Sequence, residues 1–129
     1  MGPMRSFAEA TGREMGGFRF GWNGDSGLGE YLLEKILAGR KTATTCPSYD
    51  PEEGLVGAVL PLVDKAGKPL GRIRITRVEL RPYGSFDQEL AQALGGKDVD
   101  EVRKMLSFAN SRELGPEEEM RVTYFELLK

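Results

Sequence analysis

The stretch ILAGRKTATT, from Ile36 to Thr45, holds the residues of this chain best suited to bind or transform a polar ligand. It places Lys41 among small hydroxyl side chains, directly after Gly39, which is suited to end a helix. A lysine ammonium binds phosphate or carbonyl oxygens, and a desolvated lysine can activate a neighbouring hydroxyl as a nucleophile. We therefore consider Lys41 and Thr44 as a catalytic pair, provided that the backbone turns between them.

The same residues also have a purely structural interpretation. Lys41 would then be a solvated lysine after a helix, and the threonines would fill a strand, which β-branched residues favour. The functional hypothesis instead assigns ligand contacts to the whole turn. Its candidate ligand-binding residues are Gly39, Arg40, Lys41, Thr42, Thr44 and Thr45.

The composition excludes several kinds of chemistry. Among the 129 residues there is no histidine and only one cysteine, Cys46. Histidine-dependent catalytic triads and histidine-ligated zinc sites are therefore excluded, and no internal disulfide can form. The adjacent carboxylates of Glu117–Glu119 point in divergent directions, which favours a solvated turn over a metal site. We predict neither a metal nor an organic cofactor.

Charge and hydropathy favour a small globular protein of the cytoplasm. The formal net charge is −2, and 40% of the residues are hydrophobic. No apolar run is long enough to cross a bilayer, and the first 20 residues lack the apolar core of a signal peptide. We expect no membrane partner and leave the choice between monomer and homodimer open. The charge argues against strong, sequence-independent binding of polyanions, but it permits a local basic patch or a small-ligand pocket.

One such basic stretch lies between residues 72 and 81, which include four arginines. On a strand, Arg72 and Arg74 share one face, where they would bind RNA phosphates, with Tyr83 or Phe86 close by to stack on a base. The alternative is a solvent-facing strand edge that its charges protect against aggregation.

Five further residues are candidates for the surroundings of the Lys41 pocket. Trp22 and Asn23 follow the first predicted strand, and Cys46 follows the threonines directly. A packing role for Trp22 and a buried, inert thiol for Cys46 are the alternatives. Asp50 and Glu53 lie in the next loop, from which either carboxylate could approach the lysine.

Hydrophobic periodicity predicts an α+β domain over residues 18–129, preceded by a flexible N-terminal arm over residues 1–17. A change in the apolar phase near Thr76 predicts a bulge in one strand. Asp25 or Ser26 is expected to cap the first helix, and Asp98 or Asp100 the last. The expected elements are a strand over 18–20, a helix ending at Gly39, an extended segment over 41–46, a hairpin over 58–80, short helices over 87–94 and 99–108, and a strand over 120–128.

Taken together, these segments resemble the ASCH domain family, whose members have a PUA-like β-barrel. The resemblance is carried by FRFG at 18–21, ILAGRKTAT at 36–44, LPLVDKAGKPLGRIRITRVEL at 60–80, ELAQALGG at 89–96 and TYFELL at 123–128. It implies a barrel of about five to six mostly antiparallel strands with flanking short helices, and a cleft lined by the G-x-K-T-x-T segment.

The resemblance also implies function. The family is thought to bind RNA or nucleotides, and some small bacterial members are amidohydrolases that remove the acetyl group from N4-acetylcytidine. In those enzymes a lysine, a threonine three residues later and a downstream glutamate carry the reaction. Lys41 and Thr44 match the first two by position. Leu94 stands where the glutamate is expected, and Glu89 is the nearest carboxylate that could substitute for it.

Three hypotheses follow. In the first, the cleft binds RNA, or a nucleoside or nucleotide, through the Gly39–Thr44 segment and the arginines of the basic stretch. In the second, Thr44 attacks the amide of an acylated nucleoside, Lys41 handles the proton, and Glu89 or a carboxylate of the 50–53 loop completes the relay. In the third, the cleft is vestigial and filled by side chains such as Leu94, and the domain is an interaction module.

Overall fold

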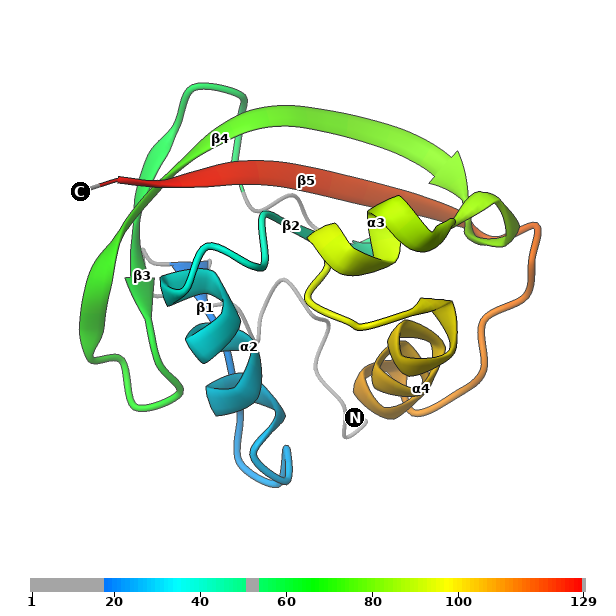
Figure 1. Ribbon diagram of the computed structural model, residues 1–129, viewed down its shortest axis with the longest axis horizontal. Helices are drawn as coiled ribbons and strands as arrows, with labels where there is room; N and C mark the ends of the chain where they lie inside the picture. The colour runs from blue at the N-terminus through cyan, green and yellow to red at the C-terminus, as the bar shows by residue number, and fades with distance from the viewer. Residues whose placement is uncertain (1–17, 51–53, 129) are drawn as a thin grey trace.

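Two long antiparallel strands, β4 (Pro69–Pro82) and β5 (Glu119–Leu128), form the frame on which the other elements are arranged (Figure 1). The structure is a computed structural model and describes residues 18–50 and 54–128. The predicted arm over residues 1–17 and the candidate Glu53 lie outside these ranges. The other elements are β1 (Phe18–Arg19), α2 (Leu28–Leu37), β2 (Ala43–Pro47), β3 (Val59–Val63), the 3-10 helix η2 (Tyr83–Ser85), α3 (Gln88–Ala93) and α4 (Val99–Asn110).

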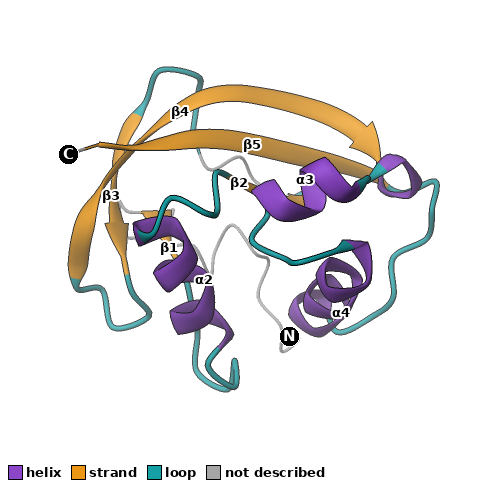
Figure 2. Ribbon diagram, in the orientation of Figure 1, coloured by secondary structure: helices purple, strands orange, loops and turns teal. Residues whose placement is uncertain are grey.

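The strands form one five-stranded sheet in the order β1-β3-β4-β5-β2. Only the short β1–β3 pair is parallel, so the described sheet is mostly antiparallel, as predicted. The β3–β4 hairpin is confirmed, and the pairing of β4 with β5 shifts between Ile75 and Arg77, which confirms the bulge at Thr76. A bulge bends its strand, and both long strands curve over the helices (Figure 2).

The sheet and the helices enclose two hydrophobic clusters. One cluster packs α2 against β1, β3, β4 and β5, and the other packs α3 and α4 against β2 and β5. Met105 of α4 packs against both. The α2 cluster includes Phe18, Leu32, Leu33, Ile36, Ile73, Ile75 and Phe125, and the other cluster includes Leu90, Leu94, Val102, Leu106, Met120 and Val122. The apolar core is therefore not continuous. A buried polar group can lie at the boundary between the two clusters without interrupting either of them.

Aspartates cap the helices, with one departure from the prediction. Asp98 accepts a hydrogen bond from the backbone N–H of Glu101 and is the N-cap of α4. Gly27, and neither Asp25 nor Ser26, occupies the N-cap position of α2. Asp25 still serves this terminus, because its carboxylate accepts hydrogen bonds from the N–H groups of Trp22, Gly27 and Gly29 at 3.0–3.2 Å. Leu37, the last residue of α2, is 47% exposed although it is apolar.

The close approach of two glycines fixes where α2 sits. A Cβ atom placed on Gly29 would lie less than 3.0 Å from the backbone of Gly21, whereas one on Gly115 would meet only the end of a flexible glutamate side chain. Gly29 is buried in the first turn of α2, and Gly21 follows β1. The first turn of α2 can therefore pack against the chain after β1 only if residue 29 has no side chain.

We predict that Gly29→Ala destabilises the protein by about 2 kcal/mol, because the new methyl group must push backbone away from backbone. On an open helix surface the same change would stabilise by up to about 1 kcal/mol through helix propensity. Gly115→Ala is the matched control and should change the free energy of unfolding by less than about 0.5 kcal/mol. Urea denaturation of the three proteins measures both effects. Equal stability of Gly29→Ala and the wild type would contradict the packing described.

Candidate functional site

The turn after α2 carries Lys41 into the interior of the molecule. Gly39 has φ = +78°, and the N–H groups of Arg40 and Lys41 both donate to the carbonyl of Lys35, which closes the turn. Lys41 is consequently only 4% exposed. Its ammonium donates hydrogen bonds to the carbonyls of Ala43 and Leu94, the latter at 2.8 Å. The structure therefore places a lysine side chain at the boundary between the two clusters, rather than in solvent.

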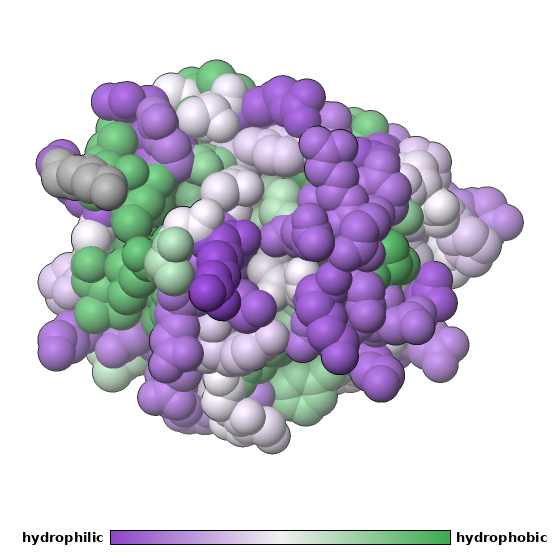
Figure 3. Space-filling model, viewed as in Figure 1, coloured by the Kyte–Doolittle hydropathy of each residue, from purple (hydrophilic) through white to green (hydrophobic). Residues whose placement is uncertain are grey.

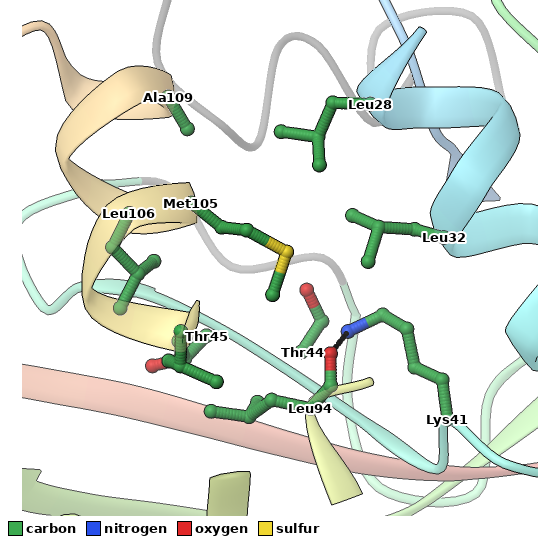
Figure 4. A pocket seen from close by; sticks show the side chains of 10 residues that line it. Leu28, Leu32, Lys41, Thr44, Thr45, Leu94, Met105, Leu106 and Ala109 are labelled. Atoms are coloured by element: carbon green, nitrogen blue, oxygen red, sulfur yellow. Dashed lines mark hydrogen bonds between the residues drawn. The ribbon is translucent and has the colours of Figure 1, made fainter. Parts of the chain in front are cut away.

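Thr44 lies beside this lysine. Its side chain is 2% exposed and, with those of Lys41 and Thr45, lines a cavity of about 40 Å³. Figure 4 shows Lys41 and Thr44 extending toward this cavity, with Leu32 and Met105 also reaching into it from α2 and α4. The turn thus brings two residues that are three apart in the sequence to one cavity. The remaining lining is apolar and consists of Leu28, Leu32, Leu94, Val102, Met105, Leu106 and Ala109.

A wider hollow of about 500 Å³ lies between α2 and α4 and shares Leu28 and Met105 with the inner cavity. We call the two hollows together the α2–α4 groove, the wider one its mouth and the cavity at Lys41 its inner end. The mouth is lined by residues 25–28 and Tyr31 on one side, and by Glu101, Lys104, Met105 and Phe108 on the other. Leu28 and Met105 therefore stand at the passage between mouth and inner end.

Aromatic side chains lie on both sides of the mouth. Phe108 is 45% exposed, and the ring of Trp22 stacks on it with 6.1 Å between centroids and 29° between planes. On the opposite side, the Tyr31 hydroxyl donates to the Glu101 carboxylate at 3.0 Å and so links α2 to α4. Sequence reasoning had named Trp22 but missed Tyr31, Met105 and Phe108. The spacing of Met105 and Phe108 on one face of a helix was the only available signal, and it is equally typical of core residues.

Glu89, the carboxylate considered as a substitute for the missing glutamate, does not line the groove. It is exposed at the first turn of α3 and lines a separate polar pocket of about 420 Å³. Thr42 lines this polar pocket, whereas Lys41 and Thr44 line the inner end of the groove, so Thr42 is on the opposite side of the turn from them. The charged residues of this pocket are Arg77, Glu79, Arg81, Asp87 and Glu89.

The arginine candidates are also remote from the groove. Arg72 and Arg74 lie on the exposed face of β4, and Arg74 forms an ion pair with Glu126 at 3.2 Å. Tyr83 and Phe86 are 8% and 9% exposed and pack edge to face in the cluster beneath α3, which leaves no open ring face for a base. The structure therefore does not join these four residues to Lys41 in one surface.

The remaining candidates lie at the far end of β2 or elsewhere. Cys46 is buried with its sulfur 3.2 Å from an Arg121 nitrogen, and the Asp50 carbonyl accepts a hydrogen bond from the same guanidinium. Glu118 of the carboxylate run pairs with Arg112 at 2.8 Å. Within residues 18–50 and 54–128, no cluster of three acidic or cysteine side chains is arranged to hold a metal ion. None of the helices described has the length and apolar character needed to span a bilayer.

Comparisons with known proteins give a consistent assignment. The sequence model of the ASCH domain matches residues 20–129. The fold is similar to that of EF3133 from Enterococcus faecalis V583, a DUF984 protein, with a TM-score of 0.67 and 24% identity over 85% of this chain and 74% of that one. It is also similar to an ASCH domain from Lactobacillus crispatus JV V101, with a TM-score of 0.64 and 20% identity over 77% and 71% of the two chains.

A third structure, the hypothetical protein PH0355, has a TM-score of 0.54 and 19% identity over 77% of this chain and 92% of its own. Among curated proteins, none matches this sequence. At these identities the structural likeness establishes the fold alone. The predicted PUA-like fold of mostly antiparallel strands with short flanking helices is confirmed, and its five strands form a curled half-barrel.

Asp25, at the mouth of the groove, gives a pH-dependent prediction. Burial raises the pKa of its carboxyl. Hydrogen bonds from three backbone N–H groups and the charge of Lys65 lower it by more, so the pKa in the folded protein lies below the ordinary value. The stabilisation is therefore complete above the unfolded-state pKa of about 4 and is lost as the pH falls through the lower folded-state pKa.

We predict that Asp25→Asn destabilises the protein by about 1–2 kcal/mol at pH 7, because the charge that holds the start of α2 is lost. The difference from wild type should shrink as the pH falls below about 4. Free energies of unfolding between pH 2.5 and 7 measure it, with Asp100→Asn, at an exposed position of α4, as the control for net charge. Parallel pH profiles of Asp25→Asn and wild type would contradict the prediction.

Proposed function

The chain belongs to the ASCH domain family, and we propose that its α2–α4 groove binds RNA by taking in one nucleoside unit, or binds the free nucleoside or nucleotide. The family is suggested to bind RNA. The observation that carries the proposal is the junction of an aromatic mouth with a buried lysine and a buried threonine hydroxyl at one inner end. This is the combination that a flat, partly polar nucleobase requires.

The volumes of the mouth and of the inner end determine which part of a nucleoside each can hold. A volume of about 500 Å³ lies within the range of roughly 300–1,000 Å³ typical of small-ligand sites, so the mouth can hold a base with its ribose. The inner end, at about 40 Å³, has room for little more than a water molecule or one small substituent. The base therefore lies in the mouth, and only a group on its polar edge reaches Lys41 and Thr44.

Each part of the groove supplies a distinct interaction. In the mouth, the base stacks on Phe108, and such stacking contributes about 1–3 kcal/mol. The ring of Trp22 packs against Phe108 and holds it in place. At the inner end, the carbonyls of Ala43 and Leu94 orient the Lys41 ammonium before any ligand arrives, so little further ordering is needed when its charge meets a base oxygen. The Thr44 hydroxyl can donate or accept, which suits an exocyclic amino or keto group.

An amidohydrolase acting on an acylated nucleoside is the second candidate. The observation in its favour is that Thr44 and Lys41 share an inner end with room for a small substituent on the base. The reaction needs a carboxylate within hydrogen-bond reach, roughly 2.6–3.2 Å between heavy atoms. Among the described residues that line this cavity, none carries a carboxylate, and Leu94 is one of them. Binding is therefore the function that the groove supports first.

We predict that cytidine or uridine perturbs the amide resonances of residues 25–31 and 101–108 in NMR titrations. Phe108→Ala should weaken this binding about tenfold, because the stacking surface is lost. Leu80→Ala, which removes an exposed apolar side chain from β4, is the matched control and should bind like wild type. Thr44→Val should weaken binding by a similar factor while leaving the ring positions intact.

N4-acetylcytidine in the same titration distinguishes the two candidates. Unchanged N4-acetylcytidine after prolonged incubation, with the same residues perturbed, supports binding alone. Cytidine release by wild type but not by Thr44→Val would favour the hydrolase. If no nucleoside and no single-stranded oligonucleotide perturbs the groove, the binding proposal is wrong and the interaction-module hypothesis takes its place.

A further inference from the structure

A basic pocket of about 340 Å³ lies near the C-terminal ends of α2 and α3, beside the loop that leads to α4. Its charged lining residues are Lys35, Arg40 and Lys97, and its remaining walls are Gln92, Gly95 and Gly96. Three cations thus line one hollow, with no acidic side chain among the described lining residues. Figure 3 shows hydrophilic side chains gathered on this face over α3 and at the end of α2.

The positive charges of this pocket are not neutralised by carboxylates of the described residues. Within the described residues, none of the three forms an ion pair with a carboxylate, although six other ion pairs occur there. Lys35 lies over the ring of Tyr31, with 4.8 Å from its nitrogen to the centroid. Gly95 and Gly96 contribute no side chain to the pocket lining. A Cβ atom on Gly95 would lie 3.2 Å from the side chain of Lys41, so the pocket is close to the inner end of the groove.

Two residues that line the mouth of the groove, Tyr31 and Glu101, also contact the lining of this pocket. Tyr31 and Glu101 line the mouth, and the bond between them links α2 to α4. Lys35 follows Tyr31 by one helical turn, and the backbone N–H of Lys97 donates to the same Glu101 carboxylate at 2.7 Å. The basic pocket and the mouth are therefore neighbouring hollows that both adjoin the Tyr31–Glu101 bridge.

We propose that the basic pocket is a phosphate site, which binds a phosphate attached to the nucleoside whose base lies in the mouth. The inference rests on the proposed function of the groove and extends it, by making a phosphorylated strand the preferred ligand over a free nucleoside. Guanidinium and ammonium groups bind phosphate oxygens through charge-assisted hydrogen bonds, and the Gln92 amide adds an uncharged donor. The net acidic protein thereby presents three positive charges beside the groove, where a backbone phosphate would lie.

The test measures binding of three probes, namely uridine, pyrophosphate and fluorescein-labelled decauridylate, to the wild type and to Lys35→Gln/Lys97→Gln. The control variant Lys68→Gln/Arg103→Gln removes two positive charges from exposed positions outside both hollows. We expect the pocket variant to bind decauridylate about tenfold more weakly than the control at 0.1 M salt. Its slope of log affinity against log salt concentration should fall by about 1.4, because each phosphate contact to a single strand contributes about 0.7. Uridine binding should be the same in all three proteins.

The outcomes separate this inference from the proposal on which it rests. Equal decauridylate affinity and equal salt slope in the two variants would overturn the phosphate site, even if uridine still binds in the groove. If uridine does not bind wild type, but pyrophosphate perturbs the amides of residues 95–97 and fails to do so in Lys35→Gln/Lys97→Gln, the phosphate site stands and the nucleoside proposal is wrong. The absence of any response to pyrophosphate, uridine or decauridylate would overturn both.

Discussion

The structure depends on the buried ammonium of Lys41 and the carbonyls that it bridges. Lys41 belongs to the turn after α2, whereas its partner Leu94 is the C-cap residue of α3. A lysine taken out of water is costly unless its protons are bonded, and the carbonyl groups at the end of a helix lack partners within that helix. One contact thus satisfies a buried charge and an orphaned carbonyl, and it joins the two apolar clusters at their boundary.

This constraint also determines where a ligand can be bound. Each cluster on its own is continuous and apolar, so a polar pocket inside either would be destabilising. The boundary already contains polar groups. Among the described residues, Leu28 and the unbranched, flexible Met105 line both hollows and so lie between these polar groups and the mouth. The α2–α4 groove therefore follows from the way in which α2 and α4 meet above Lys41. The sheet itself provides the frame and the backbone of Thr44.

Local physics in the sequence was sufficient for much of the fold. The bulge at Thr76 could be predicted from a change of apolar phase, and the cap at Asp98 from a single side chain before a helix. The groove could not be predicted in this way, because it depends on which faces of two distant helices meet. Phe108 would have been assigned to a core, and Glu89 was considered for catalysis because it is near Leu94 in sequence. Its helix turns it toward another pocket.

The most direct measurement of the central claim is the detection of intermolecular NOEs between a bound nucleoside and methionine methyl groups labelled with 13C. Met105 stands at the passage from the mouth to Lys41, whereas Met120 is fully buried in the cluster of α3 and α4. We predict NOEs from the base protons of cytidine or uridine to the Met105 methyl group and none to Met120. A saturated complex without NOEs to Met105 would show that the base lies elsewhere and would contradict the account.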